Sequence, residues 1–197
     1  MLMLMLPLAV VAQDDATELL ERAAASIRAS EGIKATFTVQ VQGVASEGTI
    51  YLRGEKFKLE TEGVTTWFDG TTQWTLVDDT EEVNISEPTA EELQSINPYA
   101  WLSLYKEGYA VRFTSGANEG ERSILMTTAK SRLDMQSIVL VINERTLVPV
   151  RLTMAGRGGQ DVAVIFIHSY DARQHYEDTL FTYPADKYPE VEVVDLR

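Results

Sequence analysis

The 197-residue chain contains no cysteine and only two histidines. The absence of cysteine excludes a disulfide framework, a thiol nucleophile, thiolate metal ligands and a lipid-modified cysteine as a membrane anchor. Basic residues are also few, because 17 Lys and Arg stand against 30 Asp and Glu, which gives a formal net charge of -13. Such a surface repels phosphate backbones, so nucleic acid is not expected as a partner.

An apolar run, MLMLMLPLAVVA, opens the chain and stops abruptly at Gln13. It is too short to span a bilayer as a helix, but it has the length of the apolar region of a signal peptide. Val10 and Ala12 occupy the small-residue positions before a cut ahead of Gln13, although no Lys or Arg precedes the run. The alternative is a buried N-terminal strand. We predict a signal peptide at residues 1–12, export of the mature chain, and a single domain at residues 13–197.

The mature sequence opens with the period of an amphipathic helix, DATELLERAAASIRAS, in which Asp15 and Glu18 form a capping pair. From Ile33 the period changes to two, and short alternating segments separated by turn residues continue to Ser86 and resume after Gly108. Short connections favour antiparallel hairpins. About eleven strands are expected, so the predicted fold class is mainly β with helices (α+β).

Helical signals interrupt the strands between Ser86 and Gly108. Thr89 and Glu92 form a capping box, and Asn97-Pro98 starts a second short helix. The large apolar residues of this second helix, which lie on more than one side, are Tyr99, Trp101, Leu102 and Tyr105. A helix of this kind is either buried or covers a cavity, so we interpret it as a lid.

Residue patterns for catalysis are weak. His168, Asp171, His175 and Asp178 fall in one segment, but their spacing matches no known metal-ligand pattern, and a polar strand end is the simpler interpretation. The GRGGQD segment at residues 156–161 links two strands, whereas phosphate-binding loops open a helix. No serine lies in a nucleophile elbow. We predict that the protein is not an enzyme and needs no metal and no cofactor, although two carboxylates brought together by folding would escape this reasoning.

The concentration of aromatic residues allows two interpretations. The rings could fill an ordinary core, or they could line an apolar pocket between a curved sheet and helices, of the kind that holds acyl chains. The order of several motifs favours the second. An amphipathic helix and IKATFTVQV are followed by GTIYLRGEKFKLE, by TTWFDGTTQWTLVDDTEEVNIS and by the helical NPYAWLSLY. This order resembles that of the outer-membrane lipoprotein carrier protein family (LolA).

The resemblance implies an incomplete antiparallel β-barrel with an N-terminal helix and a helical lid. It further implies a soluble periplasmic chaperone, by default a monomer, that carries acylated lipoproteins from the inner to the outer membrane. An ABC-type release complex in the inner membrane and an acceptor in the outer membrane would be its partners. The implied cavity candidates are Ile50, Leu52, Phe57, Leu59, Trp67, Trp74 and Leu76, and the implied lid candidates are Tyr99, Trp101, Leu102 and Tyr105.

One position departs from the family. Its well-studied members carry an arginine before a proline at the end of the second strand, and that arginine helps to gate the lid. Gly54 stands at this place here, and Arg53 comes one residue earlier. Because one residue reverses the face of a strand, Arg53 is expected to point away from the face of Ile50 and Leu52. The gating role is therefore not transferred, and a lipid or lipoprotein sensor that regulates a membrane partner stays open as an alternative function.

Overall fold

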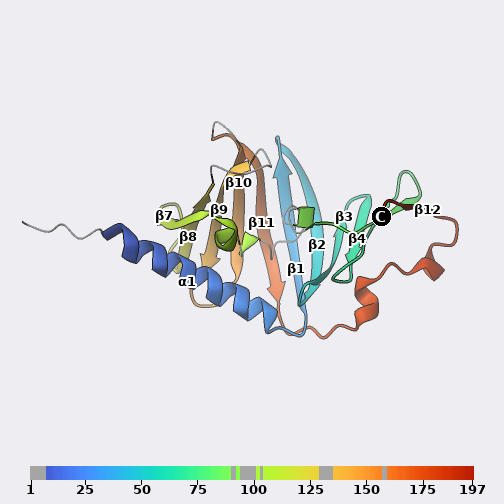
Figure 1. The fold of residues 1–197 in the computed structure, drawn as a ribbon, viewed down its shortest axis with the longest axis horizontal. Coiled ribbons are helices and arrows are strands. Elements are labelled where there is room, and N and C mark those ends of the chain that lie inside the picture. The colour runs from blue at the N-terminus through green and yellow to red at the C-terminus, as the bar shows by residue number, and fades with distance from the viewer. Residues whose placement is uncertain (1–7, 90–91, 94–100, 103, 129–134, 157–158) are drawn as a thin grey trace, which may run out of the picture. The chain divides into compact units, whose positions relative to one another are not determined.

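The computed structural model describes residues 8–89, 92–93, 101–102, 104–128, 135–156 and 159–197 (Figure 1). The N-terminal helix is α1 (Leu8–Arg28), and three 3-10 helices are η1 (Leu104–Glu107), η2 (Asp178–Phe181) and η3 (Ala185–Lys187). The strands are β1 (Ile33–Val41), β2 (Val44–Arg53), β3 (Lys56–Thr61), β4 (Val64–Phe68), β5 (Gln73–Val77), β6 (Glu82–Ser86), β7 (Ala110–Thr114), β8 (Glu121–Thr127), β9 (Met135–Asn143), β10 (Pro149–Gly156), β11 (Asp161–Asp171) and β12 (Glu192–Asp195).

The strands form a 12-stranded sheet in the order β12-β6-β5-β4-β3-β2-β1-β11-β10-β9-β8-β7. Pairing is antiparallel from β6 to β1 and from β10 to β7. The sheet is open, since β12 and β7 lie at its two ends. The predicted fold class, mainly β with an N-terminal helix and an incomplete antiparallel barrel, is confirmed. One pair differs: β12 runs parallel to β6, which is possible because a long connection rather than a hairpin separates them.

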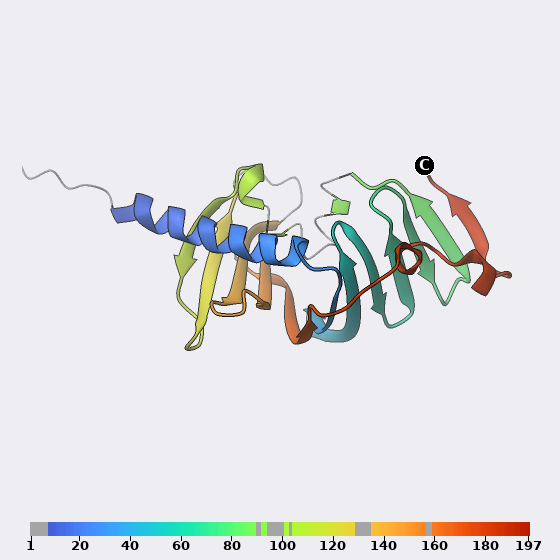
Figure 2. The same cartoon turned by 90° about the horizontal axis from the view of Figure 1, so that it is seen from below.

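Two compact units divide the chain: unit 1 comprises residues 1–24 and 102–164, and unit 2 comprises residues 25–101 and 165–197. In unit 1, α1 lies across the strands (Figures 1 and 2). The predicted apolar stripe of the helix is confirmed, because Leu19, Leu20, Ala23 and Ala24 are buried. The strands supply the buried residues Val111, Ile124, Met126, Ile138, Leu140, Ile142 and Leu152. No helix in the described part of the chain is long and apolar enough to cross a membrane.

The predicted start of α1 is wrong. The helix begins at Leu8, so Asp15 and Glu18 lie inside it and do not cap its N-terminus. Leu and Ala residues before Gln13 have good helix propensity and extend the helix toward the N-terminus. The predicted cut ahead of Gln13 would fall within this helix.

Unit 2 is built around the hairpins of β1 to β6, whose turns follow from local chemistry. Asp69 makes the turn between β4 and β5: its Oδ1 accepts the amide N–H groups of Thr71 at 2.9 Å and Thr72 at 2.8 Å. Gly70 follows with a φ of 106°, a value that favours glycine. This turn is the FDGTTQW motif, which forms the hairpin expected from the sequence.

A close contact fixes the pairing of β1 with β2. Gly48 lies directly opposite Phe37, and a Cβ added to Gly48 would lie 2.3 Å from Cζ of the Phe37 ring. The phenyl ring therefore covers the backbone of the neighbouring strand, in a space that any larger side chain would occupy. This arrangement buries Phe37 without a partner side chain on β2.

We expect Gly48→Val to lower the free energy of unfolding by about 1–3 kcal/mol, because overpacking displaces the Phe37 ring. Urea denaturation measures the change. Ser46→Val is the matched control, since it places the same side chain on the same strand and face, opposite Val39. Phe37→Ala combined with Gly48→Val should recover part of the loss. Equal unfolding midpoints for Gly48→Val and Ser46→Val would contradict the contact.

Candidate functional site

Strand register places two different surfaces on the sheet of unit 2. Residues directly opposite one another on antiparallel strands point to the same side, so the pairs Ala35–Ile50 and Ile50–Leu59 lie on one face. We call this the apolar face. Its members on β1 to β4 are Ile33, Ala35, Phe37, Ile50, Leu52, Phe57, Leu59, Thr66 and Phe68. The opposite side, which we call the tail face, carries Lys34, Tyr51, Lys58, Trp67, Trp74, Leu76 and Val83.

The apolar face is buried. Phe57 is 0% exposed and packs on Phe68 with 5.3 Å between the ring centroids. Ile50 and Leu52 are also buried, whereas Leu59 is half-buried. The hydroxyl of Thr66, which is on this face, forms a hydrogen bond with the hydroxyl of Thr75, with 3.4 Å between the two Oγ1 atoms. Apart from the Thr66 hydroxyl, this face consists of hydrocarbon and aromatic surface. Because it is buried, whatever covers it would have to move before a ligand could bind.

The tail face is covered by the chain that follows β11. Trp67, Leu76 and Val83 form a buried cluster with Trp74, Tyr183, Tyr188 and Val191 packed against it. The rings of Trp67 and Tyr183 are 5.5 Å apart in an edge-to-face arrangement, and Tyr183 stacks on Tyr188 at 5.6 Å. We call residues 172–191 the tail; Figure 1 shows the tail running along unit 2 before β12.

The predicted cavity residues therefore separate into two sets. The structure brings Ile50, Leu52, Phe57 and Leu59 together on the apolar face and places Trp67, Trp74 and Leu76 on the tail face. In the strand VTTWF, alternation alone does not show which side chain lies on which face, because both Trp67 and Phe68 are apolar and buried. Pairing with Lys58 and Phe57, respectively, decides the two orientations.

Arg53 points to the tail face, as expected from its offset from Leu52. Its guanidinium donates to the backbone carbonyl of Tyr176 and to the carboxylate of Asp178, and it lies over the Phe181 ring at 5.8 Å. Lys56 Nζ donates to the same Asp178 carboxylate at 2.7 Å. The hydrogen bond from Lys56 and the charge of Arg53 lower the pKa of Asp178. Both cations thus fasten the tail instead of reaching toward a lid.

This attachment could not be predicted from the sequence, because Arg53 and Asp178 are 125 positions apart. A weak signal was available in the tail itself, where four aromatic residues lie close together. They are Tyr176, Phe181, Tyr183 and Tyr188.

The predicted lid is described in part. The capping box is confirmed: Thr89 donates its backbone N–H to Glu92 Oε2 at 2.8 Å, and Glu92 N–H donates to Thr89 Oγ1 at 3.3 Å. Trp101 in unit 2 and Leu102 in unit 1 are both buried. Tyr105 in η1 is half-buried and donates to Glu21 Oε1 of α1 at 3.0 Å. Tyr99 lies outside the described residues.

The residues considered as metal ligands have separate partners. His168 Nε2 lies 2.6 Å from Thr38 Oγ1, and His175 Nδ1 lies 3.1 Å from Glu31 Oε2. Asp171 accepts a hydrogen bond from Arg173 Nε at 3.0 Å, and Asp178 accepts from Arg53 and Lys56. Within the described ranges no group of three His, Cys, Asp or Glu residues could hold a metal ion.

Comparisons with known proteins agree with this architecture. Residues 8–160 match the family described as "Outer membrane lipoprotein carrier protein LolA". No curated protein matches the sequence. An uncharacterized conserved protein from Thermus thermophilus has a similar structure, with a TM-score of 0.68, 14% identity, and coverage of 92% of this chain and 99% of its own.

Solved structures that contain MucB are also similar to this chain. MucB gives a TM-score of 0.53 at 18% identity, with coverage of 92% of this chain and 66% of MucB. MucB in the Pseudomonas aeruginosa MucA/MucB complex gives a TM-score of 0.50 at 15% identity, with coverage of 87% of this chain and 62% of that one. At these identities the likeness concerns the fold alone.

The attachment of the tail predicts a pH dependence. Because the folded-state pKa of Asp178 is lowered, its ion pairs stabilise the protein above the ordinary carboxyl pKa, and this stability is lost as the pH falls through the folded-state value. Asp178→Asn should therefore lower the urea midpoint at about pH 7, and the difference from the unmodified protein should be smaller at about pH 3. Tryptophan fluorescence reports the transition, since Trp67 lies under the tail.

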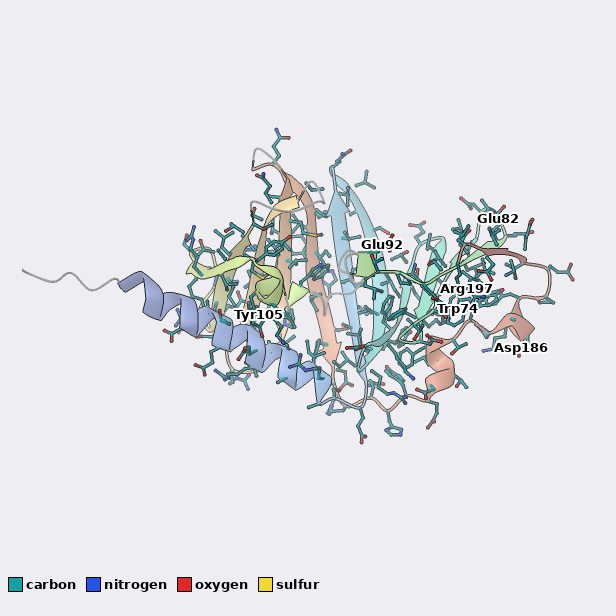
Figure 3. The ribbon with its side chains drawn as sticks, in the orientation of Figure 1. Trp74, Glu82, Glu92, Tyr105, Asp186 and Arg197 are labelled. Carbon is teal, nitrogen blue, oxygen red and sulfur yellow. The ribbon has the colours of Figure 1, made fainter. Side chains whose placement is uncertain are left out.

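Asp186→Asn is the matched control, because Asp186 is exposed, belongs to η3 of the same tail (Figure 3) and has no ion pair with any described residue. It should leave the midpoint unchanged at both pH values. Identical midpoints for Asp178→Asn and the unmodified protein at neutral pH would show that the ion pairs do not hold the tail.

Proposed function

The chain belongs to the family of the outer membrane lipoprotein carrier protein LolA, and we propose that it binds the acyl chains of lipoproteins on the apolar face of unit 2 and carries them through the periplasm. The observation that supports this proposal is the apolar face itself, a surface over four strands on which the rings of Phe57 and Phe68 pack together. Such a surface offers binding and no chemistry, so we infer a carrier and not an enzyme.

The energetics of this function rest on exchange of apolar contacts. Each buried methylene stabilises a complex by about 0.8 kcal/mol, so even one acyl chain supplies a large favourable term. Most residues of the apolar face are buried. The free energy gained by binding the acyl chain must exceed the cost of displacing the segment that covers the face. An acceptor that binds the acyl chain more tightly would then release the cargo. An inner-membrane release complex and an outer-membrane acceptor would be the partners in this exchange.

A release assay on spheroplasts tests the proposal. The chain from Gln13 onward is added, and soluble complexes are examined by mass spectrometry for acylated lipoprotein N-termini. We expect a one-to-one complex that delivers its lipoprotein to outer membranes. Spheroplasts that release no lipoprotein to the added chain would contradict the carrier function.

A regulator of a membrane partner is the second candidate. It is favoured by the likeness to MucB, which has been solved together with MucA. In this case a lipid or lipoprotein on the apolar face would change a protein contact and would not move on to an acceptor. Cargo that stays bound in the presence of outer membranes would favour the regulator over the carrier.

The two faces can be separated by mutation. Leu59→Gln changes a half-buried residue of the apolar face, and Trp74→Gln changes a half-buried residue of the tail face. We expect Leu59→Gln to weaken binding of a dansyl-labelled fatty acid about tenfold, which equals roughly 1.4 kcal/mol. Trp74→Gln should leave the affinity within about twofold. Fluorescence titration measures both, and circular dichroism checks the fold; stronger weakening by Trp74→Gln would place the site on the other face.

Trp101 tests the predicted lid. Trp101 is 6% exposed, so Trp101→Glu places a charge where an indole is buried. Because burial of the carboxylate costs free energy, the variant favours an arrangement in which the segment around Trp101 opens. In the spheroplast assay we expect less lipoprotein to be retained in the soluble complex, with the sheet still folded by circular dichroism. Normal retention by folded Trp101→Glu would remove Trp101 from the lid.

A further inference from the structure

The tail is fixed to the rest of unit 2 by backbone hydrogen bonds at its two ends. At its start, Gln174 N–H donates to the carbonyl of Gly32 at 3.2 Å. At its end, Glu192 N–H donates to the carbonyl of Glu81 at 3.0 Å, where β12 begins to pair with β6. Figure 2 shows the tail, in red, crossing the strands of unit 2 between these two points.

Between its two ends the tail bonds only to itself through its backbone. Residues 175–191 contain the short helices η2 and η3, and their backbone hydrogen bonds join neighbours within the tail, as from Leu180 to Glu177 and from Lys187 to Pro184. In the described part of the chain, no backbone–backbone hydrogen bond joins residues 175–191 to a strand or to α1. The tail can therefore open without breaking a hydrogen bond of the sheet, which places it among the segments that open at low cost.

Side chains hold the middle of the tail in the way in which proteins hold a peptide ligand. Arg53 and Lys56 both donate to the carboxylate of Asp178. Three residues further on, Phe181 is 0% exposed, and its ring lies 5.8 Å from the Arg53 guanidinium. Two further rings of the tail pack on the tail face, those of Tyr183 and Tyr188. A carboxylate between two cations, followed by aromatic anchors, is the pattern by which acidic segments are recognised between proteins.

The contacts of the tail leave room for a better occupant. The side chains of Arg53 and Lys56 are 30% and 31% exposed and that of Asp178 is 65% exposed, and ion pairs so close to water contribute modestly. The Tyr183 hydroxyl is buried and has no hydrogen-bond partner among the described residues, which costs free energy while the tail is in place. A segment with the same anchors and no such unpaired group would bind the tail face more tightly.

We propose that the tail is an autoinhibitory strap on a peptide-binding surface, and that a segment of a protein partner with a carboxylate three residues before an aromatic ring displaces it. The partner's carboxylate takes the place of Asp178 between Arg53 and Lys56, and its ring takes the place of Phe181. The tethered tail competes at a high effective concentration, so it excludes segments that bind weakly. This inference goes beyond the proposed function, because the tail face and the apolar face are opposite sides of the sheet.

A fluorescein-labelled peptide with the sequence of residues 176–191, added to the full chain, tests the inference. Asp178→Asn in the protein weakens the tethered tail and leaves Arg53 and Lys56 free for the peptide. We therefore expect the peptide to bind this variant about tenfold more tightly than the unmodified protein, as measured by fluorescence anisotropy. Asp186→Asn, in the same tail, is the matched control and should bind the peptide as the unmodified protein does. Circular dichroism checks that both variants are folded.

Variants of the peptide assign its binding to the two cations. A peptide with Asp178→Asn should bind the Asp178→Asn protein about tenfold more weakly than the original peptide, because it no longer has a carboxylate for Arg53 and Lys56. A peptide with Glu177→Gln loses the same charge at the neighbouring exposed position and should bind as the original peptide does. Equal losses for the two peptides would show that net charge, and not the site of Asp178, decides binding, and would overturn the inference.

Two further outcomes would overturn the inference. If the peptide binds the Asp178→Asn and unmodified proteins equally, or binds neither, the tail does not block a peptide site. If light scattering finds a dimer of the unmodified protein that dissociates when the free peptide is added, the occupant is the tail of a second copy and not a partner protein. Binding of the dansyl-labelled fatty acid should be the same in Asp178→Asn and the unmodified protein, so failure of this inference leaves the proposed function intact.

Discussion

The two-residue alternation of the paired strands β1 to β5 is the constraint on which the rest of unit 2 depends. The pairs Leu52–Phe57 and Phe57–Phe68 fix one side as apolar, and their neighbours Arg53, Lys58 and Trp67 necessarily project from the other side. A slip of one residue would exchange these sets and bury cations among aromatic rings of the wrong surface. The contact of Phe37 with Gly48 opposes such a slip, because only glycine fits beneath the ring.

The tail covers one of these two faces. Once Tyr176, Tyr183 and Tyr188 pack on the tail face, the aromatic residues there already have partners from the same chain. Asp178, held by Arg53 and Lys56, anchors the segment near its middle. The ion pairs are partly exposed and contribute modestly by themselves, but they fix the position in which the aromatic contacts form. The apolar face is therefore the surface of unit 2 on which we propose that a ligand binds.

Much of this architecture could be predicted from the sequence. Alternation located the strands, the Asp69-Gly70 turn gave the hairpin of β4 and β5, and the offset of Arg53 from Leu52 gave its orientation. Alternation could not show on which face of the sheet Trp67 and Phe68 lie, because both of these adjacent residues are apolar. Only their pairing with β3 shows which face each one occupies. The prediction for the start of α1 was wrong because residues of good helix propensity before the capping pattern extend the helix toward the N-terminus. The tail attachment joins residues far apart in sequence, for which no local pattern exists.

Charge connects these features to the way in which such a protein would meet a membrane. Four cations, Lys34, Arg53, Lys56 and Lys58, lie on the tail face, where Lys34 and Lys58 lie over Tyr51 at 5.4 Å and 5.7 Å. Three of the four are also paired with carboxylates. They therefore offer little free positive potential against a net charge of -13. An anionic lipid surface repels such a protein over a distance of about one Debye length, roughly 8 Å. Adsorption to lipid is thus disfavoured, and the proposed exchange of an acyl-chain ligand at a membrane would require a protein partner that overcomes this repulsion.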